Sequence, residues 1–235
     1  MQDEKIYYRR NLPHYQPSHA SYFITFRLAG SLPNEVIIKL KEEYESAIKK
    51  VKINNPQGVN VKELDDSRKR YFKRFDEFLD KHTSGPKWLN DERVAKIVED
   101  AIRYRDGKEY ELIAYCIMLN HVHLVINVER SDNSDAERTL VRKEPGDRTE
   151  VRSTVSYKNY KLTKILREIK GSTARECNKI LNRSGAFWQH ESYDHVIRNG
   201  KELANIIPYV LNNPVNAGIV DDWQKWKWSY CKYEM

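Results

Sequence analysis

Two histidines one residue apart, His121 and His123, are the side chains whose types and spacing best suit chemistry in this sequence. They lie in an apolar, β-branched run from Glu111 to Val128, which Met118-Leu-Asn120 divides into two predicted strands joined by a tight turn. Side chains alternate along a strand, so both imidazoles point to one face, roughly 7 Å apart along the backbone. Such a pair can hold a divalent metal ion. The alternative is a pair of half-exposed histidines without a ligand.

The composition describes a globular chain of 235 residues, 40% hydrophobic and 11% aromatic, which we expect to form a single domain over residues 1–235. A net charge of +7 and a pI near 9.1 favour a polyanionic partner such as nucleic acid. The three cysteines lack CxxC spacing, which argues against a disulfide framework or a zinc ribbon. The start of the chain has no apolar signal core, and the run from Leu112 to Leu119 is too short to span a bilayer, so no membrane partner is expected.

Hydrophobic periodicity predicts the elements that must position the histidines. The predicted class is α+β: a ferredoxin-like βαββαβ antiparallel sheet with a helical insertion at about 54–90, after the first strand, and an extra C-terminal helix. A polar, aperiodic segment at about 129–157 is predicted to be a loop insertion. The expected elements are a strand at Tyr22–Leu28, helices at Asn34–Val51 and Val61–Lys81, a helix after Asn90, the histidine hairpin, a helix from about Tyr160 to Leu181 with a possible interruption at Gly171, a strand within Phe187–Arg198, and a last helix.

The last helix has clear start and stop signals. Asn199 with Glu202 three residues later is typical of an N-cap with a capping box. The helix is expected to end at Asn213, because a residue before proline is pushed out of the α region. Pro208 removes one helical hydrogen bond next to Tyr209, which predicts a kink there.

The helix expected around 158–183 carries eight basic residues and two acidic ones, mostly on its solvent face. A charge run of this kind is usually only a solvated face. Beside the predicted site of His121 and His123, it also suits contacts with the backbone of a nucleic acid. Its buried stripe is expected to consist of Leu162, Ile165, Leu166, Ile169, Thr173, Cys177 and Ile180.

Several segments in fixed order resemble the Y1 (HUH) tyrosine transposase family, and more closely its REP-associated, IS200-like subgroup. The resemblance covers about residues 9 to 229, apart from the segment after Glu129. The matching segments are Arg10-Asn-Leu-Pro-His14, Tyr22-Phe-Ile-Thr-Phe-Arg-Leu28, Gly85-Pro-Lys-Trp-Leu89, Met118-Leu-Asn-His-Val-His-Leu-Val125, Trp188-Gln-His-Glu-Ser-Tyr-Asp-His-Val-Ile-Arg198 and Tyr209-Val-Leu-Asn-Asn-Pro-Val-Asn-Ala-Gly-Ile-Val220.

The resemblance implies a metal-dependent endonuclease and strand transferase for single-stranded, hairpin-forming DNA, acting through a covalent phosphotyrosine. It implies metal ligands at His121 and His123, with Mg²⁺ or Mn²⁺ as the cofactor and Tyr209 as the nucleophile. Asn213, four residues after Tyr209, is the expected third ligand; the alternative is an asparagine that only ends the helix. The implied setting is the bacterial cytoplasm at the nucleoid, and a monomer and a dimer both remain open.

Other polar residues near these segments have two readings. His195 and His190 suit either a contact with a phosphate or with a metal ligand, or a structural hydrogen bond, and Tyr193 suits packing or substrate binding. Two other functions stay open: a DNA-binding protein without catalysis, and a metal phosphoesterase that uses water. Contacts with DNA are expected from Lys161, Lys164, Arg167, Lys170, Arg175 and Arg198.

Overall fold

The computed structural model describes residues 7–9, 13–15, 17, 19–54, 61–81, 85–128 and 161–234. The predicted loop at about 129–157 and Lys158 at the start of the basic run lie outside these residues. Near the start of the chain, β1 (Tyr7–Arg9) and β2 (Pro13–Tyr15) pair as a separate two-stranded sheet.

The main sheet has five strands in the order β6-β3-β5-β4-β7, and every neighbouring pair is antiparallel. The first four strands have the order and direction of a ferredoxin-like sheet, so the predicted fold class is confirmed. Hairpin β4–β5 supplies the central strand β5 and one of its two inner neighbours, because its apolar residues can fill both faces of a buried sheet. The strands are β3 (Ala20–Arg27), β4 (Glu111–Ile117), β5 (His121–Val128), β6 (Tyr193–Ile197) and β7 (Ser229–Cys231).

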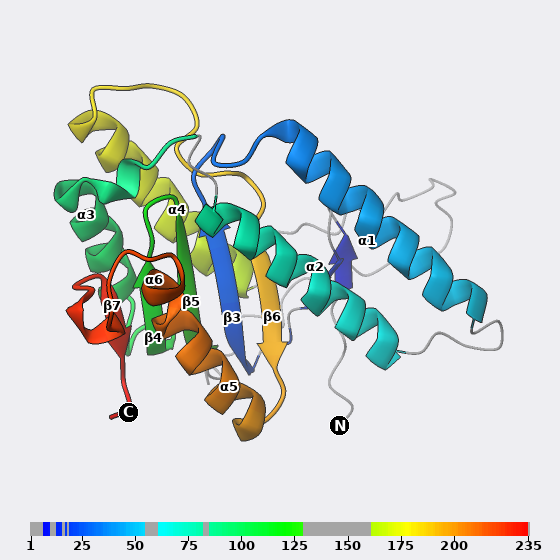
Figure 1. The fold of residues 1–235 in the computed structure, drawn as a ribbon. Helices are drawn as coiled ribbons and strands as arrows, with labels where there is room; N and C mark the ends of the chain where they lie inside the picture. Colours follow the sequence, from blue (N-terminus) through cyan, green and yellow to red (C-terminus); the bar gives the residue numbers. More distant parts are fainter. Residues whose placement is uncertain are drawn as a thin grey trace, which may run out of the picture.

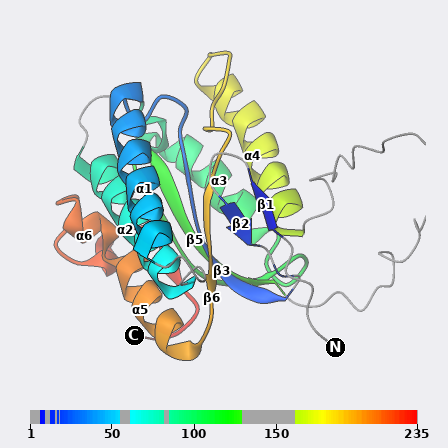
Figure 2. The same cartoon turned by 90° about the vertical axis from the view of Figure 1, so that its right-hand side faces the viewer.

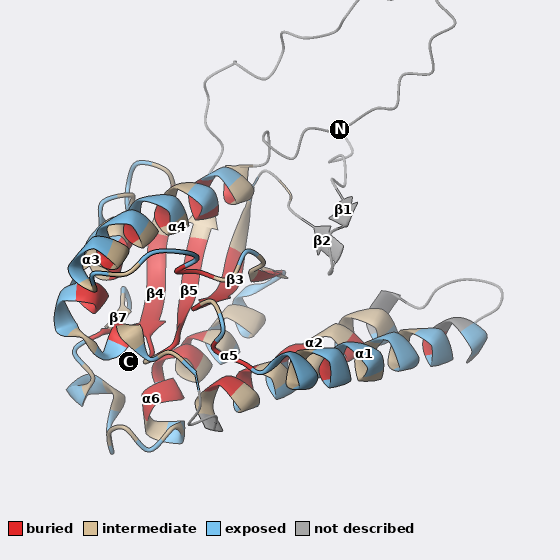
Figure 3. Cartoon of the chain, turned by 90° about the horizontal axis from the view of Figure 1, so that it is seen from above, coloured by how far each residue is buried: buried red, intermediate tan, exposed pale blue. Residues whose placement is uncertain are grey.

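Helices cover both faces of the sheet, which lies between them as a buried layer (Figures 1 and 3). Helices α3 and α4 lie on one face, and the antiparallel pair α1–α2 lies with α5 on the other (Figure 2). Asp91 caps α3 by accepting a hydrogen bond from the Arg93 backbone N–H, as a side-chain N-cap does. The helices are α1 (Asn34–Asn54), α2 (Val61–Lys81), α3 (Glu92–Arg103), α4 (Lys161–Ile180), α5 (Gly200–Leu211) and α6 (Asn213–Asn216), with short 3₁₀ turns at Trp88–Asn90 and Trp223–Lys225.

Alternation along β5 divides the core into two layers. Val122, Leu124 and Ile126 pack toward α3 and α4, whereas Val125 packs with residues of α2 and α5. His121 and His123 have the same parity as Val125, so they belong to the layer under α2 and α5. The sheet therefore presents the two histidines to a different set of helices from the one that contains the basic helix α4.

Three local predictions were wrong. The last long helix ends at Leu211, and Asn213 begins the separate short helix α6, whose first turn accommodates Pro214. The segment before Tyr193 is a loop joined to the sheet by a single bridge, and the edge strand β7 was not predicted. Ile180 is exposed, because it is the last residue of α4.

The possible interruption of α4 at Gly171 is not present, because the helix runs through that residue without a break. Helix α5 continues through Pro208. Asn199 caps α5 as predicted, although the Glu202 carboxylate accepts from the backbone N–H of Arg198. Among the described helices, none has the length and apolar character needed to cross a membrane.

Candidate metal centre and nucleophile

His121 is held in one orientation by the residue before it. The Asn120 side chain donates to the backbone oxygen of Leu79 (3.0 Å), which turns its amide oxygen toward His121. That oxygen lies 2.6 Å from His121 Nδ1 and can only accept a hydrogen bond. The proton of a neutral His121 is therefore on Nδ1, and the lone pair of Nε2 faces the interior of the site. This is the arrangement that orients a metal-ligating histidine.

His123 faces the same point from two residues further along β5. Its Nδ1 lies 2.7 Å from the hydroxyl of Thr25 on the neighbouring strand, and its Nε2 lies 3.0 Å from Nε2 of His121. Neither imidazole is exposed (0%), which excludes the reading of two half-exposed histidines. Burial lowers the pKa of His123 to about 3 and that of His121 well below its usual value, so both rings are neutral and available as ligands.

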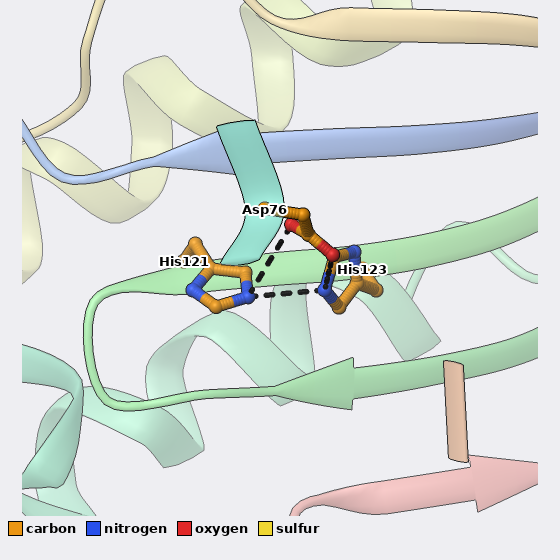
Figure 4. A group of neighbouring side chains, drawn as sticks. All are labelled: Asp76, His121 and His123. Atoms are coloured by element: carbon orange, nitrogen blue, oxygen red, sulfur yellow. Dashed lines mark hydrogen bonds and ion pairs between the residues drawn. The ribbon is translucent and has the colours of Figure 1, made fainter. Parts of the chain in front are cut away.

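Asp76 of α2 completes a buried cluster with the two histidines (Figure 4). Its carboxylate oxygens lie 3.4 Å from His123 Nε2 and 3.9 Å from His121 Nε2. One ligand atom from each of the three residues falls within 4.8 Å of the others. Burial raises the pKa of Asp76 to about 7, although Tyr209 and Asn213 act against this shift through hydrogen bonds.

The donor set of this cluster fits a cation. Oδ1 of Asp76 and Oδ1 of Asn213 are fully buried and have no hydrogen-bond partner among the described residues. A buried acceptor without a partner is costly, and here two such oxygens lie with two imidazole nitrogens. Two nitrogen and two oxygen ligands suit a divalent ion that accepts both kinds of donor.

Tyr209 on α5 is bonded directly to this cluster. Its phenol donates a hydrogen bond to Oδ2 of Asp76. The ring also packs edge-on to Phe23 and lies 6.0 Å from the His123 ring, centroid to centroid. Burial and the neighbouring Asp76 charge raise the pKa of Tyr209 far above that of a free phenol. The phenol is therefore protonated in this state, with a carboxylate in place to accept its proton.

Comparison with known proteins yields one relative of similar sequence. A Haemophilus influenzae protein (strain Rd) that has the provisional name REP-associated tyrosine transposase is 27% identical over 125 residues, which is 51% of this chain. The chain resembles the REP-associated tyrosine transposases. It spans 58% of the length of that relative, and no family model matches it.

Solved structures of two proteins show weaker likeness. One is a REP-associated tyrosine transposase bound to a REP hairpin, with 16% identity and a TM-score of 0.48, covering 94% of this chain and 80% of that chain. The other is a Deinococcus radiodurans protein described provisionally as a transposase, with 13% identity and a TM-score of 0.30 over 83% and 91% of the two chains.

Asp76 was not predicted from the sequence to belong to this site. Its signal was present in the sequence: Asp76 lies four residues after Phe72 and three before Leu79, and both are buried. An acidic residue on the apolar stripe of a helix is expensive to bury unless it has a partner or a function. Asn213 lies at the start of α6 and contacts His123, and its role as a metal ligand stays a prediction.

His195 and Arg198 help to hold α2 against β6 and α5, and they are not part of the His121–His123–Asp76 cluster. His195 Nε2 lies 2.9 Å from the Glu202 carboxylate, which also pairs with Lys69 of α2 at 2.8 Å. Arg198 pairs with Asp65 of α2 at 3.0 Å. Beside them, Phe72 of α2 stacks on Tyr193, with the ring centroids 3.7 Å apart. Of the two readings of His195, the structural hydrogen bond is the one present.

The basic helix does not lie beside the histidines, contrary to the sequence-based expectation. Its apolar residues belong to the layer on the opposite face of the sheet. Lys170 is used internally, because its ammonium donates to the backbone oxygens of Gln189 and His190 and to the Ser192 hydroxyl. Lys164, Arg167 and Arg175 are exposed, whereas Lys161 is half-buried. Any contact of α4 with nucleic acid would therefore be remote from the His121–His123 cluster.

Proposed function

We propose that this protein cleaves and rejoins single-stranded DNA next to hairpin-forming repeats, with Tyr209 as a nucleophile that becomes covalently linked to the DNA. The observation that carries the proposal is the hydrogen bond from the Tyr209 phenol to Asp76, whose carboxylate lies against His121 and His123. A candidate nucleophile, a proton acceptor and a metal-binding group thus meet at one point. The similarity to a REP-associated tyrosine transposase supports the same reaction class.

Mg²⁺ or Mn²⁺ is the cofactor that we propose, held by His121, His123 and Asp76 with Asn213 as a further oxygen donor. When bound, such an ion supplies a Lewis acid and a template for the scissile phosphate. The surrounding residues prepare the site for it. Asn120 and Thr25 fix the two imidazole rings, and α2 excludes water from the ligands.

Tyr209 supplies the bond-forming step. A phenol is a weak nucleophile while protonated, so its proton must leave as the oxygen attacks phosphorus. Asp76 Oδ2 already accepts a hydrogen bond from that hydroxyl. The new bond joins the Tyr209 oxygen to a 5′ phosphate, and the bond to the 3′ oxygen breaks. The 3′ oxygen takes up one proton as the phenol loses one, so the step balances, and a 3′ hydroxyl can later attack the phosphotyrosine to reseal a strand without ATP.

A labelled hairpin oligonucleotide with single-stranded flanks, taken from beside the gene, tests the proposal with Mg²⁺ or Mn²⁺ present. The expected products are a cut strand and a covalent protein–DNA adduct that survives denaturation. A cut without an adduct would support the water-using phosphoesterase. Binding with neither product would support the non-catalytic DNA-binding protein. Tyr230→Phe is the matched control, because Tyr230 lies on β7 and packs on Tyr115 in the opposite layer.

A further inference from the structure

Arg27 is a buried arginine on the same face of the sheet as the metal cluster. It is the last residue of β3 and pairs directly with His121 across the β3–β5 ladder. Residues directly opposite each other in an antiparallel pair point to the same face, with Cβ atoms about 5 Å apart. Only 6% of Arg27 is exposed. The charge therefore lies beside the candidate cation site and under α2.

The positive charge of Arg27 has no carboxylate partner among the residues that the structure describes. One guanidinium nitrogen donates to the Ser31 hydroxyl at 3.0 Å, and the group lies over the Phe75 ring, 5.3 Å from its centroid. Burial lowers the pKa of Arg27 to about 10, so the residue is still charged at neutral pH. Placing a charge in the interior without an opposite charge costs free energy that neither a hydroxyl nor a ring face fully offsets.

Arg103 shows how a structural arginine of this protein is satisfied. It also lies over an aromatic ring, 4.5 Å from the Tyr230 centroid, but its Nε is 3.0 Å from the Glu99 carboxylate. Arg27 stacks on the Phe75 ring, but among the described residues it has no carboxylate partner such as the one Glu99 provides for Arg103. The Arg27 side chain lies on the same face of the sheet as His121, directly opposite it in the ladder. An anion that enters the site can reach the guanidinium.

We propose that Arg27 binds a backbone phosphate of the DNA strand that enters the His121–His123 site. The inference rests on the proposed function and names a positioning residue for it. A guanidinium matches the geometry of a phosphate, and the ring of Phe75 holds its plane in place before the strand arrives. Arg27 places the strand by this contact, while Tyr209 and the metal cluster act on the scissile bond.

Two variants separate this role from a structural one. Arg27→Gln and Arg27→Met remove the charge. In the absence of DNA, a charge without a partner contributes no net stability, so the Met variant should melt at the same temperature as the wild-type protein or higher. A structural arginine would instead give a lower melting temperature in both variants.

The decisive experiment measures binding of the gene-adjacent hairpin oligonucleotide without a divalent ion, so that no cleavage occurs. Each phosphate of its single-stranded flank is replaced in turn by an uncharged methylphosphonate. For the wild-type protein, one position should weaken binding by about tenfold, the loss expected for a hydrogen bond to a charged group. Arg27→Gln should bind the unmodified oligonucleotide as weakly and show no further loss at that position, because the two changes remove the same contact.

Arg103→Gln is the matched control and should keep the wild-type methylphosphonate profile. The inference would be overturned if Arg27→Gln bound the unmodified oligonucleotide as tightly as the wild-type protein. It would also be overturned if every methylphosphonate weakened the binding of Arg27→Gln as much as it weakens the binding of the wild-type protein. These outcomes leave the proposed function intact if the adduct still forms. If the wild-type protein binds none of the oligonucleotides, the proposed function fails, and the role of Arg27 in DNA binding fails with it.

Discussion

The hydroxyl of Tyr209 donates a hydrogen bond to the carboxylate of Asp76, although the two residues lie 133 positions apart in the chain. One belongs to the long helix near the C-terminus and the other to the helical hairpin inserted after the first strand of the main sheet. The same carboxylate lies 3.4 Å from His123. Occupation of the cluster by a cation and release of the phenol would therefore depend on one side chain.

Replacing either histidine should remove high-affinity metal binding. His121→Ala or His123→Ala deletes one of the two nitrogen donors, so the heat of Mn²⁺ binding in titration calorimetry should fall below detection. Circular dichroism should keep the wild-type shape. Unchanged Mn²⁺ affinity in the double variant would show that the cluster is not the metal site.

Asn213→Ala distinguishes a ligand from a residue that only begins a helix. Because Asn213 Oδ1 is buried without a partner among the described residues, we expect loss of that oxygen to weaken Mn²⁺ binding by about tenfold, the lower end of the range for loss of a ligand-supporting group. Asn212→Ala is the matched control, since its side chain is exposed. Equal affinities for the two variants would leave Asn213 as a structural residue.

Tyr209→Phe should abolish the covalent adduct while DNA binding survives, because the change removes a single hydroxyl. In the wild-type protein, mass spectrometry of the nuclease-trimmed adduct should find the nucleotide on the peptide that contains Tyr209. A nucleotide found on Tyr193 or Tyr230 would refute the assignment but keep the phosphotyrosine mechanism.

Asp76→Asn should change how the stability of the metal-free protein depends on pH. The pKa of Asp76 rises from 3.8 to about 7 on folding, so the folded protein retains a proton that the unfolded chain releases. The contribution of Asp76 to folding stability is therefore fully present below pH 3.8 and is lost as the pH rises to about 7. Asp76→Asn has no carboxyl group at this position and so no such loss. The melting temperature of the variant minus that of the wild type should therefore be larger at about pH 8 than at about pH 5.

Manganese provides the control for this pH prediction. Mn²⁺ should stabilise the wild-type protein more than Asp76→Asn, because the amide is a poorer ligand than the carboxylate. The difference between the two melting temperatures should therefore narrow or change sign when Mn²⁺ is added. An identical pH dependence for the two proteins without metal would contradict the assignment of a raised pKa to Asp76.

Weakening the outer contacts of α2 should loosen its docking. Lys69→Gln with Arg198→Gln removes the ion pairs that join α2 to Glu202 and to Arg198, together with the Lys69–Asp65 pair inside α2, each worth about 0.2–1 kcal/mol. Amide hydrogen exchange in α2 should become several-fold faster, while exchange in α3 stays unchanged. Lys225→Gln, which breaks an exposed pair with Asp221, is the control and should leave α2 unaffected.

The surface of α4 can be tested by salt dependence. Changing Lys164, Arg167 and Arg175 together to Gln should reduce the slope of log affinity against log salt by up to about one unit for each lost phosphate contact. Lys170 is left in place because its ammonium holds the loop at 189–192. An unchanged slope would identify the exposed side of α4 as a solvated face.

The sheet and the histidine pair could be predicted because their signals are local. The alternating pattern around His121, the turn at Asn120 and the N-cap at Asn199 depend on neighbours in sequence. The apolar stripe of α2 marks Asp76 as an unusual buried acid, but it does not assign Asp76 to this site, since its partners come from β5 and α5 and are joined only by the fold. The prediction that α4 lies beside the histidines was wrong for the same reason, because a charge pattern does not tell which face of a sheet a helix covers.

The burial of His121, His123 and Asp76 under α2 controls how fast a cation can exchange with this site. A cation enters or leaves while α2 is displaced, and α2 must return afterwards, because Asp76 belongs to that helix. Local opening of α2 then limits the rate of binding and the rate of release alike. Lys69 and Arg198 touch none of the metal ligands, yet they hold the hairpin in place. Their replacement should therefore speed the binding and the release of Mn²⁺ by one common factor and leave its dissociation constant unchanged.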